Sequence, residues 1–349
     1  MQLCHKNMKV YFLHPHIHDL LSMGKYLKIT QPSNVVWDSE APEILFVSEW
    51  IYYKSRYYKK FKKLWPKAKL RVFYAGEAVE PDFNLFDYAI GFDYHHDFDG
   101  RFIRLPSPIH FFPGFIVRHE NDIMSKESAL TLLKEKTGFC SFLYSNPDAH
   151  PMRDRLFYEI SNYRRVDSLG KHLNNVGGKG TGYVGHAADG IDIKASYKFS
   201  IACENASYDG YTSEKIFTSL LAHTVPVYWG NRLIEEDVNP KAFINVRNFD
   251  SMDALIEHIR YVDAHDDVWA DMISQPWMTP DQLAKHEERT RCYTDKMNWL
   301  FNGNIEGKQR VAHGTHTEFY RKNYFEGVFP LQLNKSNYMT YIKKIFKTV

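Results

Sequence analysis

The segment 198–231, KFSIACENASYDGYTSEKIFTSLLAHTVPVYWGN, constrains the fold more than any other part of the sequence. An apolar run at 199–203 is followed by a polar loop rich in glycine and tyrosine, a helical stretch at 214–222 and a second apolar run at 225–229. Short apolar runs that alternate with helical stretches are typical of parallel sheets with helices on both faces. The segment therefore predicts a strand–loop–helix–strand unit, and the chain is predicted to be an α/β protein.

The same alternation continues through the rest of the chain. Further strands are predicted at 9–13, 43–48, 70–74, 88–92, 102–105, 139–144 and 166–169, and further helices at 52–65 and 152–163. Two halves of this kind predict two Rossmann-like domains that face a central cleft. We expect an N-terminal domain at 1–138, a C-terminal domain at 139–300 and a helical tail at 301–349 that packs back on the first domain.

The composition is that of an ordinary soluble globular protein. Hydrophobic residues make up 44% and charged residues 25% of the chain, and the formal net charge is only +2. This balance provides no electrostatic surface for nucleic acid. No leader-like start and no apolar run of about 18 residues is present. The cysteines show no CxxC spacing, which fits a reducing compartment, so we expect a cytoplasmic protein.

Two basic stretches bear on whether the chain contacts a membrane surface. The run at 52–69 mixes lysines and arginines with tyrosines, and the run at 341–347 is basic and amphipathic. The run at 52–69 is either a solvated helix face or a contact surface for anionic lipid or a polyanionic glycan, and the run at 341–347 is either solvated or a weak peripheral contact with the inner face of the cytoplasmic membrane. The sequence indicates no particular oligomeric state.

The segment 198–231 also carries the clearest binding site. Its first strand delivers Glu204 and Asn205 to the carboxyl edge of the sheet, where open α/β sheets bind ligands. Glu214 and Lys215 follow at the predicted helix start, where backbone amides attract a diphosphate. Lys215 is unfavourable for the helix, because the positive end of the helix dipole repels it, so it indicates an anionic ligand. Glu214 suits the dipole and either stabilises the helix or holds ribose hydroxyls.

Two other segments place a charged side chain at the end of an element. Glu77 follows the strand at 70–74 beside a glycine that permits close approach. A lone carboxylate at this position is either a general base or a surface residue. Arg153 lies in the first turn of the helix at 152–163, which is again an unfavourable place for a cation.

Two motifs match a known pattern only formally. GTGYVG at 180–185 has the dinucleotide spacing GxGxxG, but it follows a loop, and HAADG at 186–190 contains another glycine. We therefore interpret it as a loop and not as a dinucleotide site. Asp97 and Asp99 form a DxD triplet in a turn-like context, and such triplets occur often by chance.

The alternating histidines His14, His16 and His18 lie on one face if their segment is extended. Imidazoles at this spacing can hold zinc, although no acidic or cysteine ligand is apparent nearby. A loop after the first strand is also a natural place for contact with an acceptor substrate. The three histidines are therefore a metal site, an acceptor contact or plain surface.

At these charged segments the sequence resembles the α1,3/1,4-fucosyltransferases, glycosyltransferase family 10, in particular their bacterial branch. The matching motifs are FSIACEN, GYTSEK and VPVYWG, then FYAGE with PDFNLFDYAIGFD, and finally SNPDA with MRD. The resemblance implies a GT-B fold that binds acceptor in the N-terminal domain and GDP-β-L-fucose in the C-terminal domain. Three positions depart from the family pattern: Ser213 replaces a threonine, Cys203 an aromatic residue and Ala78 a polar residue.

The resemblance also implies a role for each candidate. Glu77 would be the general base of an inverting α1,3-fucosyl transfer to O3 of GlcNAc or Glc in N-acetyllactosamine- or lactose-type glycans, free or lipid-linked. Arg153 and Lys215 would bind the diphosphate, and Glu214 the ribose. The full donor-binding set would be Arg153, Glu204, Asn205, Tyr211, Glu214 and Lys215.

No cofactor is expected for this reaction, because two cations already stand at the diphosphate; a divalent metal is expected at most to stimulate it. One alternative is a GT-B transferase that uses another guanine-nucleotide sugar. Another is an inactive glycan-binding relative, which should have lost Glu77, Arg153 or Lys215. All three residues are present.

Overall fold

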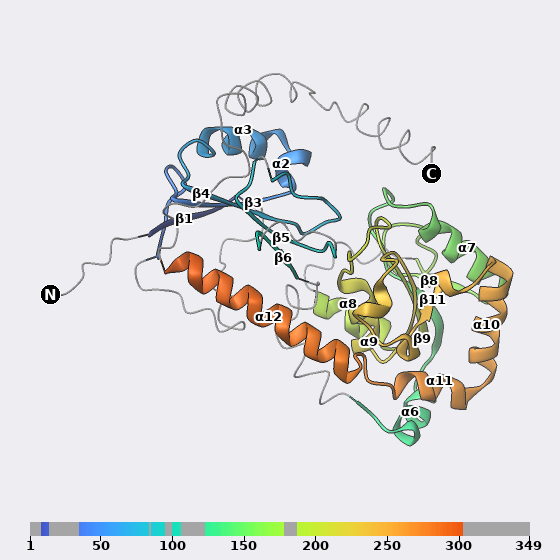
Figure 1. Cartoon of the computed structure of the whole chain (residues 1–349). Helices are drawn as coiled ribbons and strands as arrows, with labels where there is room; N and C mark the ends of the chain where they lie inside the picture. The colour runs from blue at the N-terminus through green and yellow to red at the C-terminus, as the bar shows by residue number, and fades with distance from the viewer. Residues whose placement is uncertain are drawn as a thin grey trace.

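The structure is a computed structural model that describes residues 8–13, 35–83, 85–94, 100–105, 123–177 and 187–302. Two parallel sheets, each with helices on both faces, form two α/β domains (Figure 1). The first sheet has the order β2-β1-β3-β4-β5-β6, with β1 Met8–Leu13, β2 Val35–Trp37, β3 Ile44–Ser48, β4 Leu70–Tyr74, β5 Tyr88–Gly91 and β6 Phe102–Arg104. The second has the order β11-β10-β9-β7-β8, with β7 Gly138–Phe142, β8 Val166–Ser168, β9 Tyr197–Cys203, β10 Val225–Trp229 and β11 Ile244–Asn245. The α-helices are α2 Trp50–Tyr53, α3 Ser55–Leu64, α6 Lys126–Leu133, α7 Met152–Tyr163, α8 Ala187–Lys194, α9 Glu214–Leu221, α10 Met252–Ala264, α11 Asp266–Ile273 and α12 Pro280–Phe301.

The central strands are apolar almost throughout because each sheet is buried on both faces. In β4, Leu70 and Val72 point to the side covered by α12, whereas Phe73 points to the side covered by α2 and α3. In the second domain, α6, α7, α10 and α11 cover one face of the sheet and α9 covers the other. This arrangement leaves the carboxyl ends of the strands free to carry polar residues.

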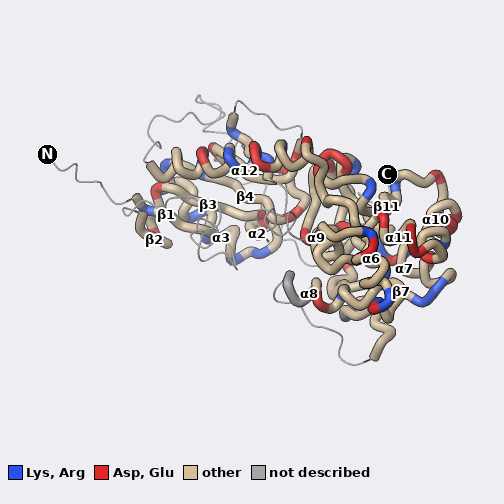
Figure 2. The backbone as a smooth tube through the Cα atoms, turned by 90° about the horizontal axis from the view of Figure 1, so that it is seen from below, with Lys and Arg blue, Asp and Glu red and all other residues tan. Residues whose placement is uncertain are grey.

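Helix α12 connects the two domains. It begins at a capping box on Thr279 beside the second domain, and its last turns pack on the first sheet through Tyr293, Met297 and Leu300 (Figures 1 and 2). Helix α6, in contrast, packs into the core of the second domain although it precedes residue 138. The domain boundaries expected from the sequence stay a prediction. In the two hydrophobic cores, α6 packs with the second domain and the last turns of α12 pack with the first.

A buried ion-pair cluster ties the domains together. Arg104 at the end of β6 donates to both carboxylate oxygens of Asp237, at 3.0 and 2.6 Å, and Arg289 on α12 donates to the same carboxylate at 2.9 Å. Burial alone would raise the pKa of Asp237, but the two guanidinium groups outweigh it and hold that pKa below its usual range. The relative position of the two strand edges is therefore fixed close to the site described below.

Most predicted elements are confirmed to within a few residues, but the helix predicted at 52–65 is two helices. Lys54 between α2 and α3 is extended, with φ −131° and ψ 114°. In one straight helix, at about 100° per residue, Ile51 would point about 140° away from Leu64. The break lets both side chains enter the same core.

The glycine in HAADG at 186–190 does not prevent a helix, because α8 begins at Ala187. Its backbone ladder tolerates the glycine at 190, which costs only about 1 kcal/mol in a helix. The sequence patterns also missed β2, an edge strand of three residues. The GxGxxG segment at 180–185 and the DxD triplet of Asp97 and Asp99 lie outside the described residues.

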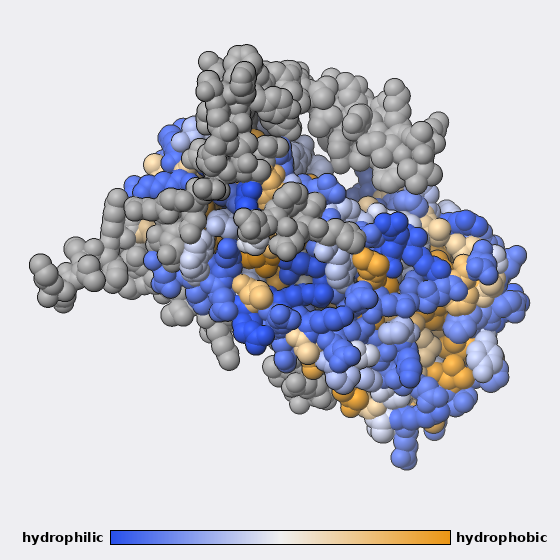
Figure 3. Space-filling model, viewed as in Figure 1, coloured by the Kyte–Doolittle hydropathy of each residue, from blue (hydrophilic) through white to orange (hydrophobic). Residues whose placement is uncertain are grey.

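Charged residues of both signs are interspersed over the two domains (Figure 2), and on the face in Figure 3 apolar residues form small groups among polar ones. In the described parts of the chain, no helix combines the length and the apolar character needed to cross a membrane. On the basic helix α3, Lys60 lies over the ring of Tyr11 and Lys63 pairs with Glu40. Contact of this helix with a membrane surface stays a prediction, as does the contact of the run at 341–347, which the structure does not describe.

Candidate active site

Two glutamates follow adjacent strands at the carboxyl edge of the first sheet. Glu49 comes directly after β3, and Glu77 lies in the loop after β4, which pairs with β3 in parallel. Glu77 is partly exposed, whereas Glu49 is buried. The edge that faces the second domain therefore carries one accessible and one buried carboxyl group.

Glu49 holds the loop that carries Glu77. Its Oε2 accepts a hydrogen bond from the backbone N–H of Gly76 at 3.0 Å. A Cβ at position 76 would lie 3.2 Å from Oε1 of Glu49, so glycine permits this close approach. Burial raises the pKa of Glu49 to about 7, against an ordinary value of 4.5. No sequence pattern singled out Glu49, although Glu49 stands after a buried strand just as Glu77 does.

We expect Glu49→Gln to make the protein less sensitive to rising pH. A carboxyl group whose pKa is raised on folding stabilises the folded state fully below pH 4.5 and loses that contribution as the pH rises through about 7. The loss of folding stability that follows from ionisation of Glu49 corresponds to roughly 3 kcal/mol. The glutamine variant does not show this loss, because its amide never ionises. Denaturant unfolding at pH 5 and pH 8 measures the loss, with the exposed Glu80→Gln as control. A wild-type-to-variant difference that is equal at both pH values would contradict the assignment.

The second domain contributes a buried cation from the point where its strand order reverses, between β7 and β9. Arg153 in the first turn of α7 is 2% exposed, and its guanidinium lies 4.1 Å from the ring centroid of Tyr144. Its Nη2 donates to Oδ1 of Asn205 at 2.6 Å and to the carbonyl of Cys203 at 3.3 Å. Its buried Nε has no hydrogen-bond partner among the described residues. Within that part of the chain Arg153 forms no ion pair, which leaves its charge available to an anion.

Glu204 at the end of β9 is fully buried and supports the start of α9. Its carboxylate accepts hydrogen bonds from the backbone N–H of Ser213 at 2.8 Å and from the Ser213 hydroxyl at 2.6 Å. It therefore satisfies a donor group at the helix N-terminus from within the protein. An ion pair of 3.3 Å also joins Oε2 of Glu204 to Nζ of Lys215.

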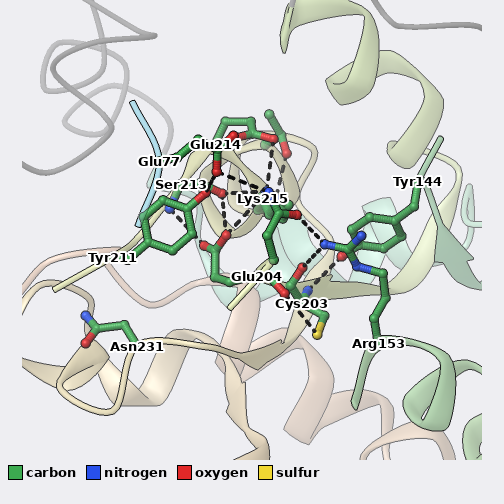
Figure 4. Close-up of polar contacts among 12 residues, drawn as sticks. Glu77, Tyr144, Arg153, Cys203, Glu204, Tyr211, Ser213, Glu214, Lys215 and Asn231 are labelled. Carbon is green, nitrogen blue, oxygen red and sulfur yellow. Dashed lines mark hydrogen bonds and ion pairs between the residues drawn. The ribbon is translucent and has the colours of Figure 1, made fainter. Parts of the chain in front are cut away.

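Lys215 lies among carboxylates (Figure 4). Its Nζ is 3.3 Å from Glu204, 3.5 Å from Glu214 and 2.9 Å from the Ser213 hydroxyl. Burial alone would lower the pKa of Lys215, but the charges of Glu214 and Glu204 outweigh it and hold that pKa above its usual range. The unfavourable position in the helix dipole is thus offset by neighbouring charge, so that position alone is a weaker indication of a ligand than the sequence suggested.

The two strand edges meet at Glu77. Its Oε2 accepts hydrogen bonds from the hydroxyl of Tyr211 at 2.7 Å and from Nδ2 of Asn205 at 3.2 Å. Figure 4 shows Glu77 and Tyr211 on one side of the site and Arg153 stacked on Tyr144 on the other, with Lys215 between them. The candidates brought into this one site are Glu77, Arg153, Glu204, Asn205, Tyr211, Glu214 and Lys215.

The histidines His14, His16 and His18 lie outside the described residues, so their roles stay predictions. In the ranges that the structure does describe, no group of three or more His, Cys, Asp or Glu side chains is placed to hold a metal ion.

Two protein-family models match the chain. The model of glycosyltransferase family 10 (fucosyltransferase), C-terminal part, matches residues 133–299. The model of the alpha-(1,3)-fucosyltransferase FucT N-terminal domain matches residues 29–111. The two matches follow one another along the chain and cover the described strands from β2 to β11.

Individual proteins agree with the family models. The chain is 33% identical over 229 residues to alpha-(1,3)-fucosyltransferase FucT of Helicobacter pylori, which covers 58% of this chain and 46% of that protein. It is 34% identical over 140 residues to alpha-(1,3)-fucosyltransferase 4 of Bos taurus, covering 39% of this chain and 33% of that protein. The chain thus spans less than half the length of these curated relatives.

Solved structures show the same architecture. A crystal structure of an α1,3-fucosyltransferase superposes with a TM-score of 0.63 at 25% identity, over 86% of this chain and 92% of that one. A second, with GDP-fucose, gives a TM-score of 0.65 at 24% identity, over 88% and 93%. The expected fold, two Rossmann-like domains in the GT-B arrangement, is confirmed.

Proposed function

Because the chain belongs to glycosyltransferase family 10, the fucosyltransferases, we propose that it moves L-fucose from GDP-β-L-fucose to a glycan hydroxyl. The acceptor we propose is O3 of GlcNAc or Glc in an N-acetyllactosamine- or lactose-type glycan, free or lipid-linked. The similarity to curated α1,3-fucosyltransferases supports this linkage.

One observation carries the proposal. A carboxylate on the first domain, Glu77, lies in hydrogen-bond contact with the loop of the second domain that leads into Lys215. Asn205 connects that carboxylate to Arg153 through its two amide atoms. A base and two cations at one domain interface are what a sugar transfer from a nucleotide diphosphate requires.

Glu77 is the proposed general base. Its carboxylate takes the proton of the acceptor hydroxyl while the hydroxyl oxygen attacks C1 of fucose and the bond from C1 to the diphosphate oxygen breaks. Attack from the face opposite GDP converts the β-linked donor into an α-linked product, so the reaction inverts. The transition state resembles an oxocarbenium ion, as in glycosidases, and negative charge grows on the leaving GDP.

Arg153 and Lys215 are the proposed partners of that charge. A guanidinium can contact a phosphate through two N–H groups, whereas an ammonium acts as a point charge. Glu214, whose side chain is 37% exposed, is the proposed partner of the ribose hydroxyls. Buried Glu204 contacts Ser213 and Lys215. Its proposed role is to hold these two residues in place and not to contact the donor itself.

The test is an acceptor panel with either GDP-fucose or GDP-mannose, scored by GDP release and by mapping of the product linkage. We expect an α1,3-fucosylated product and no mannosyl transfer, with activity retained in excess chelator. Mannosyl transfer would support the alternative of another guanine-nucleotide sugar. Glycan binding without GDP release from either donor would support an inactive relative.

A further inference from the structure

We propose that Tyr211 and Asn205 position the general base, so that the donor domain itself sets the orientation of the Glu77 carboxylate. The inference rests on the proposed function, because it assumes that Glu77 takes the acceptor proton. It adds a role to two residues that the sequence associates only with the donor pocket. Both are positioning residues, since they act on the reaction through Glu77.

Tyr211 is held so that it can only donate to Glu77. Its ring is 1% exposed and meets the ring of Phe92 edge-on, with centroids 5.0 Å apart. Burial, and then the charge of Glu77, raises the pKa of Tyr211 well above its ordinary value of 10. The hydroxyl therefore keeps its proton and donates to Oε2 of the carboxylate at 2.7 Å.

Asn205 has its amide orientation fixed from the other side. Its Oδ1 accepts from the guanidinium of Arg153 at 2.6 Å, so its Nδ2 is directed to Oε2 of Glu77 at 3.2 Å. An amide turned the other way would set its NH₂ against the cation and its oxygen against the carboxylate. The same amide thus joins the proposed diphosphate partner to the proposed base.

Both donors reach the same oxygen of Glu77. Among the described residues no hydrogen bond reaches Oε1, so Oε1 is the oxygen that we assign to the acceptor proton. Two donors on Oε2 hold the carboxylate in one orientation and leave Oε1 for the acceptor. Glu49 supports Glu77 indirectly, because it accepts a hydrogen bond from the backbone N–H of the neighbouring Gly76.

The loop from which Tyr211 projects is anchored by other contacts. The hydroxyl of Tyr208 donates to Asp93 at 2.6 Å, and Arg104 donates to the carbonyl of Gly210 at 3.3 Å. Gly210 has φ +92°, and a Cβ there would lie 2.0 Å from the carbonyl oxygen of Phe92. The domains therefore approach closely at this loop, and the loop does not depend on the Tyr211 hydroxyl for its place.

Tyr211→Phe tests the inference, with Tyr208→Phe as the matched control. Each variant removes one tyrosine hydroxyl that crosses the same domain interface, but only Tyr211 donates to Glu77. Because hydrogen bonds to charged groups contribute more than neutral ones, we expect kcat to fall about 10- to 100-fold in Tyr211→Phe. The KM for GDP-fucose and the Kd for GDP should change less than about 3-fold, because the lost contact acts in the transition state and not on the bound donor.

A second measurement does not need activity. The carboxyl carbon of Glu77 is followed by NMR in protein labelled with ¹³C-glutamate and assigned by its loss in Glu77→Gln. Its chemical shift should move in Tyr211→Phe, which removes a donor from Oε2, and stay at the wild-type position in Tyr208→Phe. An unchanged chemical shift in Tyr211→Phe, or a loss confined to the KM for donor, would overturn the inference. A chemical shift that responds to Tyr211→Phe as expected, in a protein whose wild type transfers no fucose, would instead overturn the proposed function.

Discussion

Glu77→Gln is expected to abolish most fucosyl transfer while the protein still binds GDP. The amide has nearly the shape of the carboxylate but cannot take a proton, and removal of a general base typically lowers the rate about 10²- to 10⁴-fold. Glu77 makes no described contact with Arg153 or Lys215, so the proposed diphosphate site should persist. Initial rates at saturating GDP-fucose and acceptor measure the loss, and calorimetric titration with GDP measures what is retained.

The control for this prediction is Glu80→Gln, which neutralises an exposed carboxylate three positions further along the same loop. It should leave kcat within about 2-fold of wild type, since isolated surface charges contribute little. Near-wild-type turnover in Glu77→Gln would remove the residue from the role of base. Equal loss of GDP binding and turnover would instead indicate a damaged interface, because Tyr211 and Asn205 then no longer meet a carboxylate.

The sequence predicted the strands of this fold well because parallel strands buried on both faces are continuous apolar runs. The predicted bounds of β4, α7 and β10 agree with the structure to the residue. The break at Lys54 was not predictable from the pattern, since it depends on the direction in which Ile51 must point to reach the core. Strand β2 was missed because an edge strand of three residues contributes little to any periodic signal.

The candidate site, like the fold, was only partly predictable from the sequence. Charged residues at strand ends and helix starts could be found from the sequence, because those positions are fixed by local structure. What each charge contacts could not, since Glu204 and Lys215 meet only after β9 and α9 have packed. Glu49 escaped notice because its burial depends on the loop around Gly76, which no local pattern encodes.

Arg153→Lys is the second variant for which we expect a large loss, in donor binding and in turnover together. The guanidinium stacks on Tyr144 and donates to Asn205, and the proposed mechanism also uses it on the leaving diphosphate. Lysine keeps the charge but loses the planar, forked donor geometry, so the change is not conservative at such a site. Removing one donor from a preorganised site for developing negative charge typically costs about 10²- to 10³-fold in kcat. Steady-state rates and the Kd for GDP measure the two effects.

Arg155→Lys supplies the matched control, because Arg155 lies two residues further along α7, is more than half exposed and has a 3.8 Å contact with Glu159 as its ion pair among the described residues. This control should bind GDP and transfer fucose like the wild type. Since Asn205 would lose the partner that orients its amide, Arg153→Lys should also move the ¹³C chemical shift of the Glu77 carboxyl group. A loss of GDP affinity without that movement would show that Arg153 serves the leaving group alone and that the link through Asn205 carries no energy.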